Sequence, residues 1–495
     1  MSLEVSAIGL DDPELVRGQA FIDGTWCDAD GGRTFPVTNP ATGEELARVP
    51  RMGAVETRRA IAAAERALPE WAGRPAAERA RLLRRLADLM MDSQEDLARL
   101  LTLEQGKPVA ESRAEVAYAA SFYEWFGEEA KRVYGDTIPS PQPGRRILVT
   151  KHPIGVCGGI TPWNFPSAMV TRKSAPALAV GCTMVLKPAE QTPLSALAVM
   201  VLAERAGLPA GVLSIVTGDA EDAPAIGTEL TSSPVVRKVG FTGSNEIGKL
   251  IMRQCSEQVK NVSLELGGNA PFIVFDDADL DQAVAGALLC KYRNSGQTCI
   301  TANRILVHES IHDAFLERFC EGARALTVGE GTDPASDIGP LIDAAAFDKV
   351  SRHVTDAVER GARLLMGGEP HERGGTFYSP TVLDGVSDES ALWHEETFGP
   401  VAGIRTFATE EEAIAVANDT PYGLAAYFYS SDLARTIRVS ERLEYGILGI
   451  NTGFVSVEVA PFGGVKESGM GREGSKYGVD DWIETRYLAL GGVGA

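Results

Sequence analysis

The sequence predicts an α/β fold in which helices cover both faces of a parallel sheet. From Ile154 onward, short β-branched or apolar runs alternate with helical stretches, which is typical of strand–helix–strand units. The alternation starts again near Pro271 and continues to about Asn451, so a second α/β unit is expected. A chain of 495 residues also exceeds one ordinary core, and we expect two or three domains.

The elements are expected in the following order. Apolar periodicity predicts helices over 76–103 and 113–133, followed by a Pro-rich link at 138–144 and an isolated strand at 145–151. The first α/β unit has predicted strands at 156–160, 183–187, 212–217 and 238–242, and predicted helices at 168–180, 195–206, 220–231 and 246–254. Further strands are predicted at 261–266, 271–275 and 304–307.

Composition argues against several classes of function. The net charge of −21 disfavours binding to nucleic acid or to an anionic membrane, and an anionic substrate would need a local cationic pocket. No apolar run reaches the about 18 residues of a membrane span, and the first residues do not resemble a signal peptide. The seven scattered cysteines predict a reducing, cytoplasmic location without a disulfide framework.

Three short motifs resemble cofactor sites but are interpreted as structural. The H-E-x-x-H motif at 308–312 would bind zinc only with both histidines on one helical face, whereas a strand–helix junction is predicted between them, so no metal is expected. The near P-loop at 243–250 has Leu250 where magnesium needs Ser or Thr, although its glycines suit a phosphate-binding turn. The G-x-G-x-x-G at 469–474 has too little chain after it for a βαβ unit.

Three residues together indicate covalent oxidation of an aldehyde. Cys299, in the sequence GQTC, is a candidate nucleophile because a thiolate attacks a carbonyl carbon readily. Glu265 ends a predicted strand before two glycines and is a candidate general base. Asn164, held between two aromatic residues and two prolines, is a candidate oxyanion donor. Taken singly, each has an ordinary alternative: a buried structural thiol, a solvated loop carboxylate and a turn amide.

A fourth motif suggests a nucleotide. Lys187 and Glu190, in the sequence KPAE, follow a predicted strand at a βα turn, where open α/β sheets bind nucleotides. The two side chains could hold the ribose hydroxyls of an adenosine, and a surface salt bridge is an equally good interpretation of the pair alone.

Together these elements resemble the aldehyde dehydrogenase superfamily. The motifs that carry the resemblance, in family order, are TPWNFP (161–166), KPAE (187–190), FTGS (241–244), ELGG (265–268), GQTC (296–299), EETFGP (395–400) and PFGG (461–464). The resemblance implies a Rossmann-like NAD(P)-binding domain of 1–137 and 152–264 and a catalytic domain of 265–450. It also implies an oligomerisation arm with a C-terminal substrate loop, 138–151 and 451–495, and a homodimer or homotetramer.

The resemblance also implies roles for single residues. Cys299 corresponds to the nucleophile, Glu265 to the general base and Asn164 to the oxyanion donor, in an NAD(P)-dependent oxidation through a thiohemiacetal and a thioester. Cofactor contacts are implied for Trp163, Lys187, Glu190, Gly243, Ser244, Leu266, Glu396 and Phe398. Glu190 favours NAD over NADP, because a carboxylate accepts a hydrogen bond from a free ribose 2′-hydroxyl and repels a 2′-phosphate.

Within the family, the segments 269–279 and 450–478 resemble succinate-semialdehyde dehydrogenases. This resemblance implies that Arg172, Arg293 and Ser456 hold the far carboxylate of the substrate, whereas structural ion pairs are the alternative for the two arginines. Thr301 stands where some relatives carry a second cysteine, so no redox switch is expected there. The remaining alternatives are a glutarate-semialdehyde or other omega-carboxy semialdehyde dehydrogenase, a thioesterase, and a non-catalytic structural protein on the same fold.

Overall fold

The computed structural model describes residues 8–493, and the expectation about a signal peptide rests in part on residues 1–7, which lie outside this range. Its first large sheet has eight strands in the order β19-β11-β10-β7-β8-β9-β1-β2. The five central strands are parallel: β11 (Asn261–Glu265), β10 (Val236–Thr242), β7 (Val156–Ile160), β8 (Thr183–Lys187) and β9 (Leu213–Ile215). The antiparallel edge strands are β19 (Gly469–Met470), β1 (Ala20–Ile22) and β2 (Thr25–Cys27).

Some helices of this unit pack on the sheet, and those over 76–129 pack mainly on other helices. The helices are α1 (Ala54–Gly73), α2 (Ala76–Asp92), α3 (Gln94–Gln105), α4 (Val109–Glu129), α5 (Pro166–Val180), α6 (Pro193–Ala206), α7 (Ala223–Ser232) and α8 (Asn245–Ser256). The single helix expected over 76–103 is wrong: α2 ends at Asp92 and α3 begins at Gln94, because the backbone of Ser93 leaves the helical conformation, with φ −102° and ψ 18°. Every residue of α5 is buried, which places it in the centre of the unit.

The second large sheet has the order β14-β15-β16-β13-β12-β17-β18 and is parallel except for β14. Its strands are β12 (Ala270–Val274), β13 (Ala302–His308), β14 (Arg363–Met366), β15 (Thr381–Asp384), β16 (Val401–Phe407), β17 (Ala425–Tyr429) and β18 (Ile447–Ile450). Its helices are α9 (Leu280–Tyr292), α10 (His312–Arg324), α11 (Ala344–Glu359), α12 (Ala391–His394), α13 (Glu410–Asn418) and α14 (Leu433–Arg442). His308 ends a strand and His312 begins a helix, so the two histidines straddle the predicted junction.

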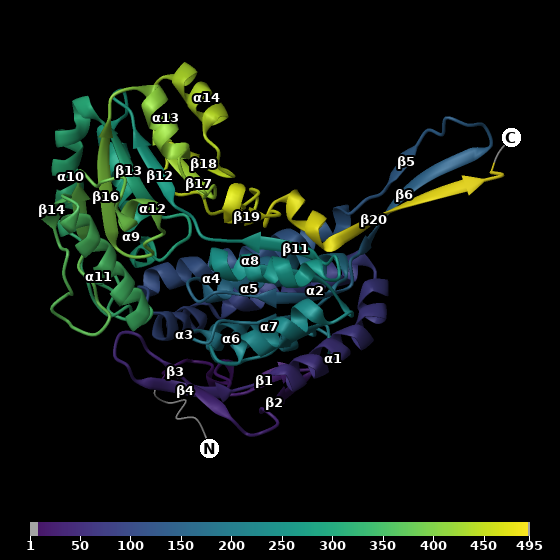
Figure 1. Ribbon diagram of the computed structural model, residues 1–495. Coiled ribbons are helices and arrows are strands. Elements are labelled where there is room, and N and C mark those ends of the chain that lie inside the picture. The colour runs from purple at the N-terminus through teal and green to yellow at the C-terminus, as the bar shows by residue number, and fades with distance from the viewer. Residues whose placement is uncertain (1–7, 494–495) are drawn as a thin grey trace.

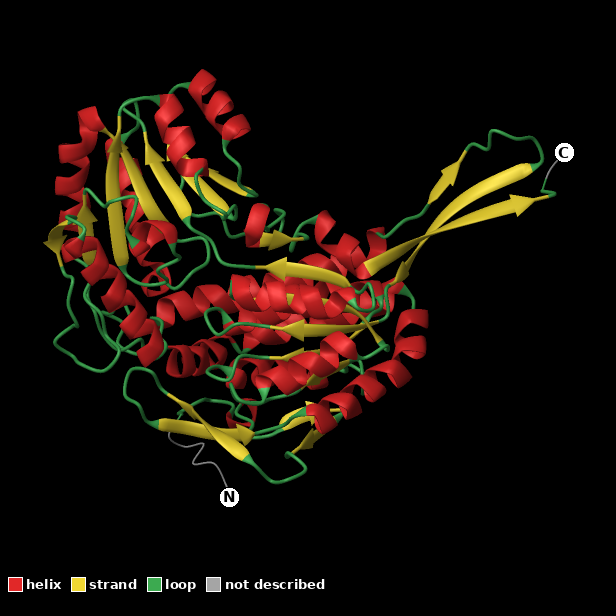
Figure 2. Cartoon of the chain, in the orientation of Figure 1, coloured by secondary structure: helices red, strands yellow, loops and turns green. Residues whose placement is uncertain are grey.

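A three-stranded arm projects from the body of the molecule (Figures 1 and 2). It pairs β6 (Arg145–Pro153) with β20 (Ile483–Gly491) and with β5 (Asp136–Ile138), so the isolated strand expected at 145–151 meets the C-terminal segment. A separate hairpin of β3 (Thr34–Thr38) and β4 (Glu45–Pro50) was not anticipated.

Short 3-10 helices complete the chain: η2 (Pro13–Leu15), η3 (Ala130–Arg132), η4 (Arg293–Gly296), η5 (Glu309–Ile311), η6 (Lys466–Ser468) and η7 (Lys476–Trp482). The α/β fold class is confirmed, whereas the domain boundaries stay a prediction. Within residues 8–493, no helix combines the length and the apolar character that a membrane crossing requires.

Candidate active site

Three neighbouring parallel strands of the first sheet bring predicted site residues to one edge. Asn164 follows β7, Gly243 follows β10, and Glu265 is the last residue of β11. The Gly243 N–H donates to the Glu265 carbonyl oxygen at 3.0 Å, and the Ser244 hydroxyl accepts the N–H of Ile247 at the start of α8. Because the carboxyl ends of parallel strands meet at one edge of a sheet, this edge is where a ligand is expected.

The loop that carries Cys299 has an unusual backbone. Asn294, Ser295 and Gly296 all have positive φ angles, of 51°, 56° and 74°. For a residue with a side chain this conformation costs about 1–2 kcal/mol, so surrounding contacts must hold the loop. A Cβ atom on Gly296 would lie 2.2 Å from the carbonyl oxygen of Gly399, so the turn requires glycine at this position.

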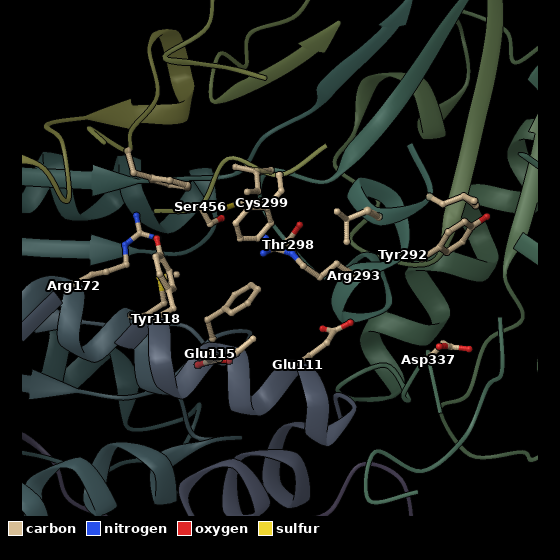
Figure 3. Close-up of a pocket in the computed structure, with 18 of the residues that line it drawn as sticks. Glu111, Glu115, Tyr118, Arg172, Tyr292, Arg293, Thr298, Cys299, Asp337 and Ser456 are labelled. Atoms are coloured by element: carbon tan, nitrogen blue, oxygen red, sulfur yellow. The ribbon is translucent and has the colours of Figure 1, made fainter. Parts of the chain in front are cut away.

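Two cavities meet at Cys299, which lines both. We call them the large cavity, of about 500 Å³, and the small cavity, of about 370 Å³. The large cavity contains the residues implied for the substrate, Arg172, Arg293 and Ser456, and Figure 3 shows Arg293 and Cys299 between its two ends. The small cavity is lined by most residues implied for catalysis and cofactor: Trp163, Asn164, Gly243, Ser244, Glu265, Leu266, Glu396 and Phe398.

The two arginines of the large cavity differ in their partners. Arg172 is buried, with its Nε 2.6 Å from Glu473 Oε2 and its guanidinium 4.0 Å from the ring centre of Phe462. Arg293 forms no salt bridge with any residue between 8 and 493, and its guanidinium lies 5.4 Å from the ring centre of Phe165. Arg172 therefore has an ion-pair partner, although its Nη2 has no hydrogen-bond partner among residues 8–493, and the roles implied for both arginines toward a substrate carboxylate stay predictions.

Two glutamates that line the small cavity have raised pKa values. Burial, and then the charge of Glu473, raise the pKa of Glu265 well above its ordinary value, and neither of its carboxyl oxygens has a hydrogen-bond partner among residues 8–493. Burial raises the pKa of Glu396 to about 7, although Glu396 accepts the Gly268 N–H at 2.9 Å. An unpaired carboxyl group at a strand end, beside a thiol, is suited to take a proton.

The Asn164 side chain is already engaged on one side. Its Nδ2 donates to the carbonyl oxygen of Gln297 at 3.0 Å, in the loop that carries the thiol. An amide nitrogen has two N–H groups, so this bond fixes the orientation of the side chain and leaves one donor for a ligand.

Burial, and then the charge of Glu396, raise the pKa of the Cys299 thiol to about 12. The sulfur is therefore protonated at neutral pH and needs a base before it can attack.

The KPAE pair is not part of either cavity lining. Lys187 Nζ donates to the Pro188 carbonyl oxygen at 3.0 Å and to Glu190 Oε2 at 3.4 Å. The pair still lies at the same sheet edge, since the Thr161 N–H after β7 donates to the Lys187 carbonyl oxygen at 3.1 Å. Its role toward a ribose stays a prediction.

Charged residues before and on α4 were missed from the sequence. Lys107 precedes the helix, and Glu111 and Glu115 lie on it and line the large cavity (Figure 3). Their spacing of four residues was the available signal, but the predicted helix began only at residue 113. The Arg172 partner Glu473 was also missed, because it lies far away in the sequence.

The chain is similar to known proteins over almost its whole length. The family model described as "Aldehyde dehydrogenase family" matches residues 26–488. The chain is 60% identical to a glutarate-semialdehyde dehydrogenase of Pseudomonas aeruginosa over 484 residues, covering 98% of this chain and 100% of that protein. It is 59% identical to the succinate-semialdehyde dehydrogenase (NADP(+)) GabD of Escherichia coli, covering 97% and 99%. A crystal structure of an NADP dependent enzyme of E. coli, 59% identical, superposes with a TM-score of 0.96 and covers 97% and 100%.

Proposed function

Because the chain belongs to the aldehyde dehydrogenase family, we propose that it oxidises an aldehyde with a carboxylate at its far end, succinate semialdehyde first among them, to the dicarboxylic acid. One observation carries the proposal: Cys299 lines both cavities, with the unpaired Arg293 in one and Glu265 in the other. Glutarate semialdehyde is the second candidate, supported by the named activity of the P. aeruginosa relative and by a cavity of about 500 Å³.

The proposed chemistry divides between the two cavities. In the large cavity, Arg293 binds the carboxylate and orients the aldehyde carbon toward Cys299. Glu265 accepts the thiol proton, the sulfur attacks the carbonyl carbon, and the free N–H of Asn164 stabilises the oxyanion. After the hydride has left the carbonyl carbon, Glu265 releases the thiol proton to solvent and then takes a proton from the water that cleaves the Cys299 thioester, which frees the acid and returns the thiol.

The lining of the small cavity supports binding of the nicotinamide half of a dinucleotide, which when bound would supply the hydride acceptor, while the adenosine half would lie outside it, toward Lys187 and Glu190. Gly243 and Ser244 form a turn at the N-terminus of α8, where backbone N–H groups favour a pyrophosphate. Glu396 lines the small cavity and would contact a ribose. The rings of Trp163 and Phe398 meet edge to face, with 5.5 Å between their centres, and enclose the space beside the thiol.

We propose NAD as the preferred dinucleotide, on the argument that the Glu190 carboxylate repels a 2′-phosphate. The name of the E. coli relative points toward NADP, and Glu190 is paired with Lys187 and partly exposed, so its side chain has room to turn. The ratio of kcat/KM with NAD to that with NADP tests the preference. Glu190→Ser should move this ratio toward NADP by about tenfold, the value of one charge-assisted contact.

The arm and the cysteines support proposals about the oligomeric state and the cellular compartment of the protein. The edge strand β20 and its neighbours project from the body and are largely exposed, which supports a homodimer or homotetramer built through the arm. None of the seven cysteines forms a disulfide, which supports the cytoplasm. The division into 1–137 with 152–264, 265–450, and 138–151 with 451–495 belongs to the same proposal. Light scattering after gel filtration measures the assembly.

The substrate assignment is tested with the intact enzyme, NAD or NADP, and three aldehydes: succinate semialdehyde, glutarate semialdehyde and butanal. Formation of the reduced nicotinamide should be fastest, by kcat/KM, with succinate semialdehyde and slowest with butanal. Preference for butanal would overturn the assignment. Hydrolysis of a thioester without dinucleotide reduction would indicate a thioesterase instead.

A further inference from the structure

Lys107 and the start of α4 lie beneath the loop that carries the thiol. Lys107 lies two residues before the helix begins at Val109, and Glu111 and Glu115 lie four residues apart on one face of the helix. Figure 3 shows both glutamates in the wall below Cys299 and Arg293. The three residues have no part in the chemistry described above, so another role must explain their hydrogen bonds.

Glu111 binds the backbone of the loop. The Asn294 N–H donates to both carboxyl oxygens of Glu111, at 2.8 and 3.1 Å. Asn294 and Ser295 are the two residues with side chains that adopt the left-handed conformation in this loop. A buried N–H in such a turn has no partner in a helix or strand, and the carboxyl group supplies one.

Lys107 binds the segment that carries the oxyanion donor. Its Nζ donates to the Asn164 carbonyl oxygen at 2.7 Å and to Glu115 Oε2 at 2.6 Å. The other oxygen of Glu115 accepts the Ser167 N–H at 3.0 Å, at the start of α5. The same Asn164 carbonyl oxygen also accepts Asn294 Nδ2 at 3.0 Å, so the two segments meet above the three charged side chains.

We propose that Glu111 is a positioning residue of the active site. By holding the Asn294 N–H, it fixes the distance between the Cys299 sulfur and the Asn164 amide, while Lys107 and Glu115 hold Asn164 from the other side. The inference rests on the proposed thiol chemistry, because an oxyanion donor matters only if the sulfur attacks a carbonyl group.

The test compares Glu111→Met with Glu104→Met in the intact enzyme. Glu104 is a matched control: it is a buried carboxyl group that accepts two backbone N–H groups, of Leu194 at 2.8 Å and Ser195 at 2.7 Å, and it lines neither cavity. Glu111→Met should lower kcat for butanal about 100-fold with a KM within about threefold, since a displacement of about 1 Å at the reacting atoms has this effect. Glu104→Met should lower the thermal midpoint and leave kcat of the folded enzyme unchanged.

A conservative pair keeps the test valid if Glu111→Met does not fold. Glu111→Gln retains one acceptor oxygen for the Asn294 N–H, so its kcat should fall only about three- to tenfold, against no change for Glu104→Gln. A kcat for the Glu111 variants no lower than for the matching Glu104 variants would overturn the proposal, as would a Glu111→Gln loss as large as that of Glu111→Met.

A second readout separates this inference from the proposed function. Iodoacetamide alkylates Cys299 without any turnover, and its rate depends on where the sulfur lies. If the unaltered enzyme oxidises no aldehyde, the proposed function fails. A Cys299 alkylation rate that changes at least about fivefold in Glu111→Met and not in Glu104→Met would still support positioning of the loop, and equal rates would refute it.

Discussion

Arg172 and Glu473 form a buried ion pair in the wall of the large cavity, with 2.6 Å between Nε and Oε2. Lys173 binds the other carboxyl oxygen of Glu473 at 2.8 Å, so one carboxylate faces two cations. Burial acts to raise the pKa of Glu473, but Lys173 and Arg172 outweigh it and lower this pKa to about 2. The pairing explains why Arg172 is held in place and why Arg293 is the better candidate for the substrate carboxylate.

Glu473→Gln should therefore destabilise the fold. Removing the carboxylate leaves two buried cations without their partner, and the free energy of unfolding at pH 7 should fall by about 3–5 kcal/mol. Because folding lowers the pKa of Glu473, its contribution to stability is present above pH 4.5 and is lost as the pH falls toward about 2. Urea unfolding at pH 7 and pH 3 measures both effects. Glu467→Gln, which breaks only an exposed pair with Lys249, should change the free energy by less than about 1 kcal/mol.

Arg293→Ala should weaken binding of a charged substrate selectively. One charge-assisted contact is worth about 1.5–3 kcal/mol, so KM for succinate semialdehyde should rise about 10- to 100-fold. Butanal lacks the carboxylate, and its KM should change little. Steady-state kinetics with both aldehydes make the comparison, and equal increases for the two would remove Arg293 from carboxylate recognition.

Cys299→Ala should abolish dinucleotide reduction, because no other thiol lines either cavity within residues 8–493. Among residues 8–493 the Cys299 sulfur makes no hydrogen bond, so dinucleotide binding, measured by calorimetry, should be unchanged. An active Cys299→Ala enzyme would end the assignment of the nucleophile.

Alkylation of Cys299 should depend steeply on pH. With a thiol pKa of about 12, the rate in the absence of ligands should still rise about tenfold per pH unit between 7 and 10. Glu396 has a pKa of about 7 and is charged above that pH, where its charge raises the thiol pKa. Glu396→Gln should therefore speed alkylation at pH 9. Peptide mass spectrometry gives the rates, and a plateau near pH 8 would contradict the raised pKa.

Lys291→Met should stabilise the protein at neutral pH. Lys291 Nζ is buried and has no hydrogen-bond partner among the described residues, and burial lowers its pKa from 10.5 to about 7. Between these values the unfolded chain binds a proton that the folded chain does not, so stability rises with pH over this window. The variant should gain about 2–4 kcal/mol at pH 7, and the gain should shrink toward pH 10. Urea unfolding of the variant and the unaltered protein at pH 7 and pH 10 measures this gain. A variant no more stable than the unaltered protein at pH 7 would contradict the prediction.

The sequence allowed the parallel strands to be predicted because strands buried on both faces are short continuous apolar runs, such as those of β8 and β12. The edge strands β1 and β2 were missed, since three residues carry too little periodicity to be distinguished from a loop. The break at Ser93 was missed because the apolar pattern continues through it.

Residues in local motifs, such as Cys299 and Glu265, could be found because their neighbours in the sequence are also their neighbours in space. The partners of Arg172 could not be found in this way. Glu473 meets Lys173 across 300 residues of chain, and only the folded chain shows that a cation is already neutralised. The same holds for Glu111, whose partner Asn294 is 183 residues away.

The placement of Cys299 between two cavities has a consequence for the order of events. The large cavity includes the exposed side chains of Leu289 and Phe454, and the small cavity includes exposed Ser244 and Ala345, so each opens on its own stretch of surface. Under the proposed assignment of the two cavities, aldehyde and dinucleotide would arrive and depart independently, and neither would wait for the other to vacate a shared passage.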